Sequence, residues 1–337
     1  MTAITQAADG TPVAAPPAAV AAAARPQPDP RYLALRNFAI SITVFNILGY
    51  TVLGFEQPWA WFPLAVLTGY TTELVFEVIS ARAERRAPRF LVGGLRGLYE
   101  FLLPAHITAT ACNMLLYAND QWWPIMFAVV VAVAQKHVFK APVYGRMRHF
   151  LNPSNTGITV TLLLFGTWVS IAPPYQFTEY ANSVFRVLIP VVIATAGTVI
   201  NAVLTKRILL IMGWAGGFAI QALVRHWIWD VALFSALGVM TGVAFILFTN
   251  YMISDPGTTP SRGRAQFVFG ASLAVIYAIL MVANVVYTLF YATTILCALR
   301  GLGWWGAHLL RKRRERRAAA VSAVGEDRRG DEMSMTT

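Results

Sequence analysis

Ionisable residues lie inside apolar stretches of this sequence, where a charge is costly. Glu73 and Glu77 are four residues apart, which places both carboxylates on one face of a helix. Glu100 and His106 flank Pro104 in the next apolar stretch. Intramembrane ionisable residues indicate a path, so we assign Glu73, Glu100 and His106 to an ion or proton path. The structural alternatives are that Glu77 reaches the interface or pairs with an arginine, and that His106 donates to a carbonyl freed by Pro104.

A cluster of small and polar residues opens a later apolar stretch. It consists of Asn152, Pro153, Ser154, Asn155, Thr156 and Gly157, and it follows a segment that carries Lys140, Arg146 and Arg148. Asn152 is a natural helix cap, and Pro153 suits a first helical turn. Free N–H groups at a helix start beside basic residues form an anion site. We predict cofactor binding at Asn152–Asn155 through a flavin phosphate or a phosphorylated headgroup; a simple cap with orienting charges is the alternative.

A third cluster is the turn Ser254-Asp255-Pro256-Gly257-Thr258-Thr259-Pro260, which is followed by Arg262 and Arg264. The Asp255 carboxylate can accept the free N–H groups of this turn and can pair with either arginine. The density of polar groups is more than a connector needs. We therefore predict that the turn binds a cofactor through Asp255, Thr258, Thr259, Arg262 and Arg264.

The elements that must position these residues are membrane helices. Of the 337 residues, 57% are apolar and only 13% are charged, whereas soluble domains carry about 25% charged residues. The pattern predicts an all-α polytopic membrane protein with about ten transmembrane helices. The predicted spans are about 37–55, 59–80, 98–117, 122–138, 155–171, 184–204, 208–224, 228–253 and a run over 265–299 that we divide near Ala283-Asn284.

The loops between these spans alternate in charge. Those after the even-numbered spans are rich in arginine and lysine, and most of the others have almost none. Under the positive-inside rule both termini are cytoplasmic, and the protein is a multi-pass protein of the inner (plasma) membrane. The net charge of +11 therefore reflects orientation in a lipid membrane and does not indicate nucleic acid as a partner.

The two ends of the chain differ from its centre in composition. Residues 1–30 are rich in alanine and proline and are expected to be disordered. Residues 31–310 form the predicted transmembrane domain, and 311–337 a basic, then polar, disordered cytoplasmic tail. Cys112 and Cys297 lie in apolar segments without metal-ligand spacing, so no metal site is predicted.

Two of these clusters carry a family resemblance. Two segments resemble signatures of the RnfD/NqrB family. One is the Ser254–Pro260 turn with the following Arg262-Gly263-Arg264, and the other is Asn152-Pro153-Ser154-Asn155 after its basic loop. Its members are membrane components of the Rnf-type electron-transport complex and of the sodium-translocating NADH:quinone oxidoreductase. The resemblance covers about residues 35–300, and Glu73 aligns with a glutamate of the family's second span. It implies ten helices, a flavin and partner proteins, either redox partners or other components of a complex.

The sequence departs from the family at its flavin attachment site. In the family, the flavin is covalently attached to a threonine in an Asp-Gly-x-Ser-x-Ala-Thr type of motif. The corresponding loop here, about 172–183, contains Thr178 but not this motif. We therefore expect no covalent flavin, and FMN or riboflavin would be held noncovalently. Short relatives with these motifs look like membrane proteins encoded in enediyne antibiotic clusters of actinomycetes.

Three functions are compatible with this sequence, one of which is a scaffold that only anchors soluble enzymes to the membrane and would leave Glu73 and Asp255 replaceable. The first is a membrane-embedded electron-transfer subunit, an oxidoreductase component with noncovalent flavin or quinone that supports enediyne natural-product biosynthesis. The alternative is a transporter for export of, or self-resistance to, a hydrophobic product. Transporters often contain inverted repeats, and the absence of a clear repeat disfavours that alternative.

Overall fold

The computed structural model describes residues 30–143, 145–173, 177–178 and 181–334, and almost all of the predicted amino-terminal tail lies outside them. The described part is dominated by helices, which confirms the all-α prediction. Its strands form two two-stranded antiparallel sheets. One pairs β1 (Leu116–Tyr117) with β4 (Ser170–Ile171). The other is a hairpin of β2 (Lys140–Val143) and β3 (Arg146–His149), in which Lys140 pairs with His149.

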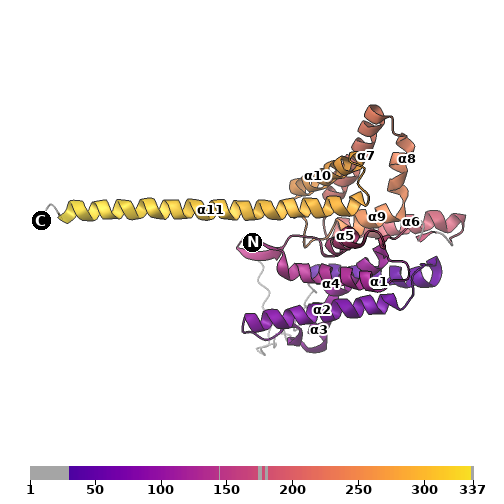
Figure 1. The fold of residues 1–337 in the computed structure, drawn as a ribbon, viewed down its shortest axis with the longest axis horizontal. Coiled ribbons are helices and arrows are strands. Elements are labelled where there is room, and N and C mark those ends of the chain that lie inside the picture. The colour runs from indigo at the N-terminus through magenta and orange to yellow at the C-terminus, as the bar shows by residue number, and fades with distance from the viewer. Residues whose placement is uncertain (1–29, 144, 174–176, 179–180, 335–337) are drawn as a thin grey trace, which may run out of the picture.

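The first half of the chain forms one group of packed helices (Figure 1). Within this group α2 packs on α3 and α4, α4 packs on α5, and α1 packs on α3. Small residues bring these helices together: a side chain at Gly157 would meet the backbone oxygen of Ala128. The elements are α1 (Pro30–Leu48), η1 (Gly49–Leu53), α2 (Trp61–Ala83), η2 (Arg89–Leu91), α3 (Gly94–Leu115), α4 (Trp123–Val138) and α5 (Pro153–Phe165).

The second half is built around the neighbouring helices α7 and α10. Trp214 of α7 is fully buried and contacts the rings of Phe218, Phe245, Phe248 and Tyr277. The elements of this half are α6 (Ser183–Val199), η4 (Ile200–Leu204), α7 (Ile208–Trp229), α8 (Leu233–Gly238), η5 (Val239–Thr241), α9 (Val243–Leu247), η6 (Phe248–Met252), α10 (Gly263–Val282) and α11 (Thr288–Ser334).

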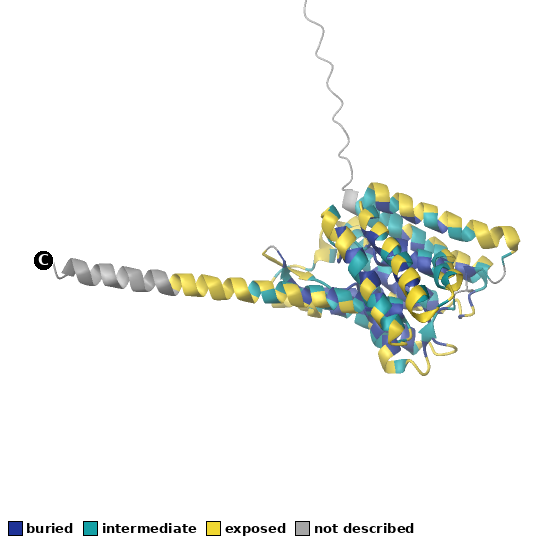
Figure 2. Cartoon of the chain, turned by 90° about the horizontal axis from the view of Figure 1, so that it is seen from above, coloured by how far each residue is buried: buried dark blue, intermediate teal, exposed yellow. Residues whose placement is uncertain are grey.

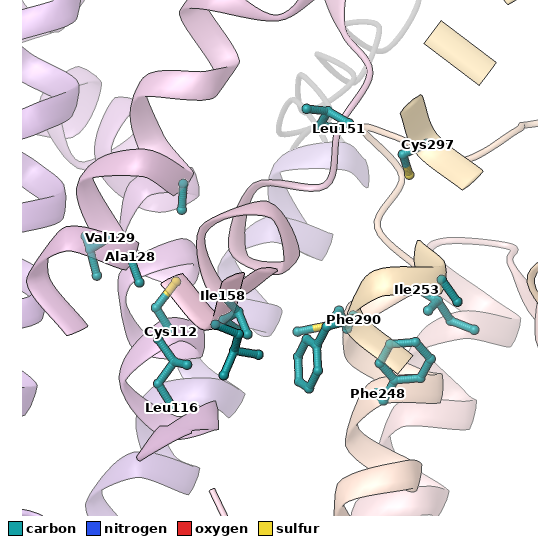
Figure 3. Close-up of a cluster of buried hydrophobic side chains, with 14 of the residues drawn as sticks. Cys112, Leu116, Ala128, Val129, Leu151, Ile158, Phe248, Ile253, Phe290 and Cys297 are labelled. Atoms are coloured by element: carbon teal, nitrogen blue, oxygen red, sulfur yellow. The ribbon is translucent and has the colours of Figure 1, made fainter. Parts of the chain in front are cut away.

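One apolar core joins the two halves (Figure 3). Cys112, Leu116 and Ile158 come from the first half, and Phe248, Ile253 and Phe290 from the second. Both cysteines are buried and free. The polar segments that follow α4 and η6 are therefore held in place by a common core.

Five helices in the described residues are long and apolar enough to cross a membrane: Tyr32–Leu53, Trp61–Ala83, Ser183–Leu204, Ile208–Trp229 and Gly263–Val282. A sixth span results if Leu233–Thr241 and Val243–Met252, which are bent by 61°, count as one. Each of the ten predicted spans overlaps helical residues. However, α4 and α5 have only 16 and 13 residues, and a full crossing takes about 20. Ten crossings remain a prediction.

Many residues on the outside of the helices are exposed (Figure 2), and large apolar side chains are common among them. Val187 of α6, Phe234 of α8 and Ile279 of α10 are 66%, 91% and 62% exposed. Exposing many large apolar side chains to water is unfavourable, because the cost grows with the exposed apolar area. Together with the five spans, this surface identifies a multi-pass membrane protein.

The carboxyl-terminal helix is longer than the sequence led us to expect. Residues 311–337 were predicted to be disordered, yet α11 continues to Ser334 and projects from the helical body (Figures 1 and 2). Alanine, arginine, lysine and glutamate are strong helix formers and dominate the segment after Leu310. Helix propensity therefore outweighs the polarity that suggested disorder.

The orientation of the chain leads to a first prediction. A reporter fused after Gly145, in the turn of the β2–β3 hairpin, should report the cytoplasm, because its loop is basic. A reporter fused after Gln176, which lies outside the described residues, should report the opposite side. Paired alkaline phosphatase and fluorescent protein fusions measure this. If both positions report the same side, the predicted topology is wrong.

Candidate functional site

The Asn152 side chain links two of the segments that the sequence singled out. Its backbone is extended, and its Oδ1 accepts the N–H of Asn155 at 3.1 Å, so it caps α5 as predicted. Its Nδ2 donates to the carbonyl of Met252 at 2.9 Å, two residues before Ser254. The Asn-Pro-Ser-Asn segment and the Asp255 turn are therefore joined at the same end of the helices.

Asn155 connects this helix start to α11. Its Nδ2 donates to the carbonyl of Phe290 at 2.9 Å and to Oγ1 of Thr294 at 2.7 Å. The side chain is completely buried, and its Oδ1 has no hydrogen-bond partner within the described structure. A buried acceptor without a donor costs about 1–3 kcal/mol, so this oxygen is a place where a ligand donor would be stabilising.

Asp255 caps its own turn with both carboxylate oxygens. Oδ1 accepts the N–H of Gly257 at 3.0 Å, and Oδ2 accepts the hydroxyl of Thr258 at 2.8 Å. The Asp255 carbonyl also accepts from the N–H and hydroxyl of Thr259. Both threonines are buried. The local turn chemistry predicted from the sequence is therefore present.

The cations beside the turn are not the two that we predicted. Arg262 and Arg264 are exposed, and no ion pair joins either to Asp255 in the part of the chain described. The arginines in contact with the turn are Arg207, whose Nε donates to Thr259 Oγ1 at 3.0 Å, and Arg300, which donates to the Thr258 carbonyl. Arg262 is the residue before α10, and Arg264 lies in the first turn of that helix.

Arg207 is the more unusual of these cations. Only 7% of the residue is exposed, and no carboxylate of the described residues lies within ion-pair distance of it. Burial lowers the pKa of its guanidinium, and the Asp255 carboxylate opposes that shift. Arg300 is in addition placed over the Trp304 ring at 4.3 Å. Sequence reasoning treated Arg207 only as an orienting loop charge.

His149 brings the hairpin to the same turn. A Cβ atom at Gly257 would lie 3.4 Å from its Nε2, so the ring packs directly on that residue. Burial lowers the pKa of His149, while the Asp255 carboxylate works in the opposite direction. The His149 ring can hydrogen-bond through either nitrogen. The sequence pointed to the hairpin only as a basic loop.

The predicted path residues are divided among separate groups. Glu73 is 9% exposed. One of its carboxylate oxygens pairs with Lys136 at 2.6 Å, and the other lies 3.8 Å from His137 Nε2. Glu77 pairs with Arg86 at 2.5 Å and accepts the N–H of Arg89, which confirms pairing with an arginine as its structural alternative.

His106 and Glu100 lie elsewhere. The His106 ring is hydrogen-bonded to Thr43 at 2.7 Å and to Tyr70 at 2.9 Å, so it links α1, α2 and α3. These two bonds occupy both ring nitrogens, and donation to a carbonyl freed by Pro104 is not its role. Glu100 forms an exposed pair with Arg96 at 2.8 Å. Glu100 therefore lies apart from the buried polar groups.

The Asp255 turn with its two threonines is thus contacted by Arg207, Arg300 and His149, and Asn152 bonds just before it. Asn155 lies one helical turn along α5 and contacts α11 instead. This arrangement combines a surplus of positive charge with buried hydrogen-bonding groups, which suits an anionic or carbonyl-rich organic ligand. Within the described residues no group of three or more His, Cys, Asp or Glu side chains could hold a metal ion. No protein-family model matches the chain, and no curated protein shows significant similarity to it.

Proposed function

We propose that this chain is a membrane-embedded electron-transfer subunit that holds a flavin (FMN or riboflavin) or a quinone noncovalently at the Asp255 turn. The observation that carries the proposal is that the Asp255 turn is contacted by the buried Arg207 and is joined to the Asn-Pro-Ser-Asn segment through Asn152 and Met252. The resemblance of both segments to those of electron-transport membrane proteins supports it. The same resemblance suggests that its electrons serve natural-product biosynthesis with the help of partner redox proteins.

The residues present fit such a group. A flavin or quinone offers carbonyl oxygens, and FMN adds a phosphate; both accept hydrogen bonds from a guanidinium such as that of Arg207. The unpaired Oδ1 of Asn155 could accept the ring N–H of a flavin. The bound group would supply one- or two-electron transfer, which no side chain of this turn can provide.

The chain's own residues would bind and orient the group. Asp255 holds the turn through Gly257 and Thr258, which fixes the hydroxyl of Thr259 opposite Arg207. Because Arg207 is desolvated, its charge interacts more strongly than a surface arginine with an anionic reduced cofactor.

The second prediction tests this site in the purified protein. Acid extraction followed by absorbance and mass analysis should recover FMN, riboflavin or a quinone, and a denaturing gel should show no fluorescent band, because attachment is noncovalent. Arg207→Gln should lower the amount retained by about tenfold, since a charge-assisted hydrogen bond is lost. The exposed Arg262→Gln is the matched control and should retain the cofactor.

Asp255→Asn separates binding from folding. Asparagine caps about as well as aspartate, so we expect membrane yield and unfolding temperature to stay close to those of the unchanged protein, within about 1 kcal/mol. Cofactor retention or electron transfer should nevertheless fall, because the asparagine Nδ2 cannot accept the Thr258 hydroxyl, and the turn then positions Thr259 less firmly opposite Arg207. Unchanged retention in both Arg207→Gln and Asp255→Asn, or an extract without any cofactor, would refute the proposed site.

A transporter for a hydrophobic product is the second candidate, and one observation favours it. The chain bends by 61° between Leu233–Thr241 and Val243–Met252, and η1, η4 and η6 are π-helical turns that extend apolar helices. Broken helices are common at transporter binding sites. Substrate-dependent flux into vesicles, from protein without bound flavin or quinone, would support this function instead.

A further inference from the structure

A basic pocket outside the Asp255 site lies between the β2–β3 hairpin and α11. Its volume is about 490 Å³, and its lining includes Arg146 and Met147 of the hairpin and Trp305, Arg311, Lys312 and Glu315 of α11. Three cations and one carboxylate give this set a surplus of positive charge. None of the four charged side chains forms an ion pair with another residue of the described chain.

The two walls of the pocket are held together by specific contacts. Trp305 Nε1 donates to the carbonyl of Lys140 at 3.0 Å, which ties α11 to β2. One turn earlier on α11, Gly301 packs against the Phe150 ring so closely that a Cβ there would lie 2.3 Å from it. The hairpin turn itself needs Gly145, whose φ is +78°. The charges are thus arranged on a fixed scaffold rather than on a loose tail.

The position of the pocket along α11 indicates the ligand. The helix is largely apolar up to Leu310 and basic from Arg311 onward. Leu302 and Leu309 are exposed and lie three and four residues from Trp305, next to it on the helix surface. Tryptophan at such a boundary is typical of the membrane interface. A ligand that bridges the two regions must have an anionic head and an apolar body.

We infer that this pocket binds the phosphate of an anionic phospholipid from the leaflet that faces the basic part of α11. Arg146, Arg311 and Lys312 would contact the phosphate, and Met147, Trp305 and the exposed leucines would contact the start of the acyl chains. Arginine recognises phosphate through two parallel N–H donors, and each cation near an anionic lipid surface strengthens binding. The inference does not depend on the proposed electron transfer.

The test uses the full chain purified in neutral detergent. Short-chain phosphatidylglycerol, phosphatidylcholine of equal chain length and inorganic phosphate are titrated separately while the unfolding temperature is recorded. Phosphatidylglycerol should stabilise the protein at the lowest concentration. Equal stabilisation by phosphatidylcholine would contradict the charge argument, and equal stabilisation by inorganic phosphate would show that the pocket takes a soluble anion instead of a lipid.

Charge variants then locate the effect. Arg146→Gln/Arg311→Gln/Lys312→Gln should weaken the response to phosphatidylglycerol at least about tenfold. The control Arg313→Gln/Arg317→Gln removes two cations from the neighbouring part of α11 that do not line the pocket and should respond like the unchanged protein. If the triple variant is poorly produced, the exposed single variant Arg311→Gln serves in its place. An unchanged response in the pocket variants would overturn the inference.

Discussion

Gly213→Leu should prevent stable assembly of the second helical group, whereas Gly216→Leu should be tolerated. A Cβ at Gly213 would lie 2.3 Å from the Phe267 carbonyl oxygen, and one at Gly270 would lie 2.2 Å from that of Leu210. The helices α7 and α10 therefore touch backbone to backbone. Because neither obstructing atom belongs to a flexible side chain, a leucine must push the helices apart. We expect a loss of at least about 3 kcal/mol, at the upper end of overpacking effects.

Gly216 is the matched control because it lies on the same helix with nothing within 4 Å of its added Cβ. Size-exclusion profiles and unfolding temperatures of the two variants in the same detergent measure the difference. The displaced helices would also disturb Trp214, the centre of the aromatic cluster, so tryptophan emission should shift in Gly213→Leu. Similar unfolding temperatures for the two variants would show that α7 and α10 are not packed as described.

Lys136→Met should strongly destabilise the first helical group. This change removes the Lys136 ammonium, which lies 2.6 Å from the Glu73 carboxylate, and leaves that carboxylate buried. Removing one member of a buried ion pair typically costs about 3–5 kcal/mol, because the remaining charge stays desolvated. The double variant Glu73→Gln/Lys136→Met should recover most of this loss, since no unpaired charge remains.

The exposed pair of Arg96 and Glu100 provides the comparison. Arg96→Met removes a partner at a similar distance, 2.8 Å, yet should cost at most about 1 kcal/mol because water solvates the remaining Glu100. Thermal unfolding of these variants beside the unchanged protein measures the contrast. A double variant as unstable as Lys136→Met would mean that Glu73 does more than balance Lys136, and measuring proton flux with Glu73→Gln would then test its place in a path.

Local chemistry of the predicted site could be read from the sequence. Asn152 before proline predicts a capped helix start, and Asp255 before Pro256-Gly257 predicts a capped turn; both caps are present. These features depend on residues within three positions along the chain, so no distant contact is needed to form them. The four-residue spacing of Glu73 and Glu77 likewise placed both carboxylates on the buried side of α2.

The partners of these local features could not be read in the same way. Arg207 and Arg300 lie 52 and 42 positions from the threonines they contact, and nothing in the local pattern distinguishes them from orienting loop charges. Arg262 and Arg264 are closer to Asp255 in sequence, and for that reason we predicted them as its partners. Both are exposed, because α10 begins at Gly263 directly after the turn.

The sequence by itself determined that the chain is helical, apolar and suited to a membrane, because composition and the period of apolar residues act over short distances. It also determined where caps and turns form. Only the tertiary structure decided which cation is buried beside Asp255, which carboxylate pairs with Lys136, and how α11 meets the hairpin to form a basic pocket. Those outcomes depend on contacts between distant segments, such as that of Gly301 with the Phe150 ring. Burial is a property of the assembled structure rather than of any one segment.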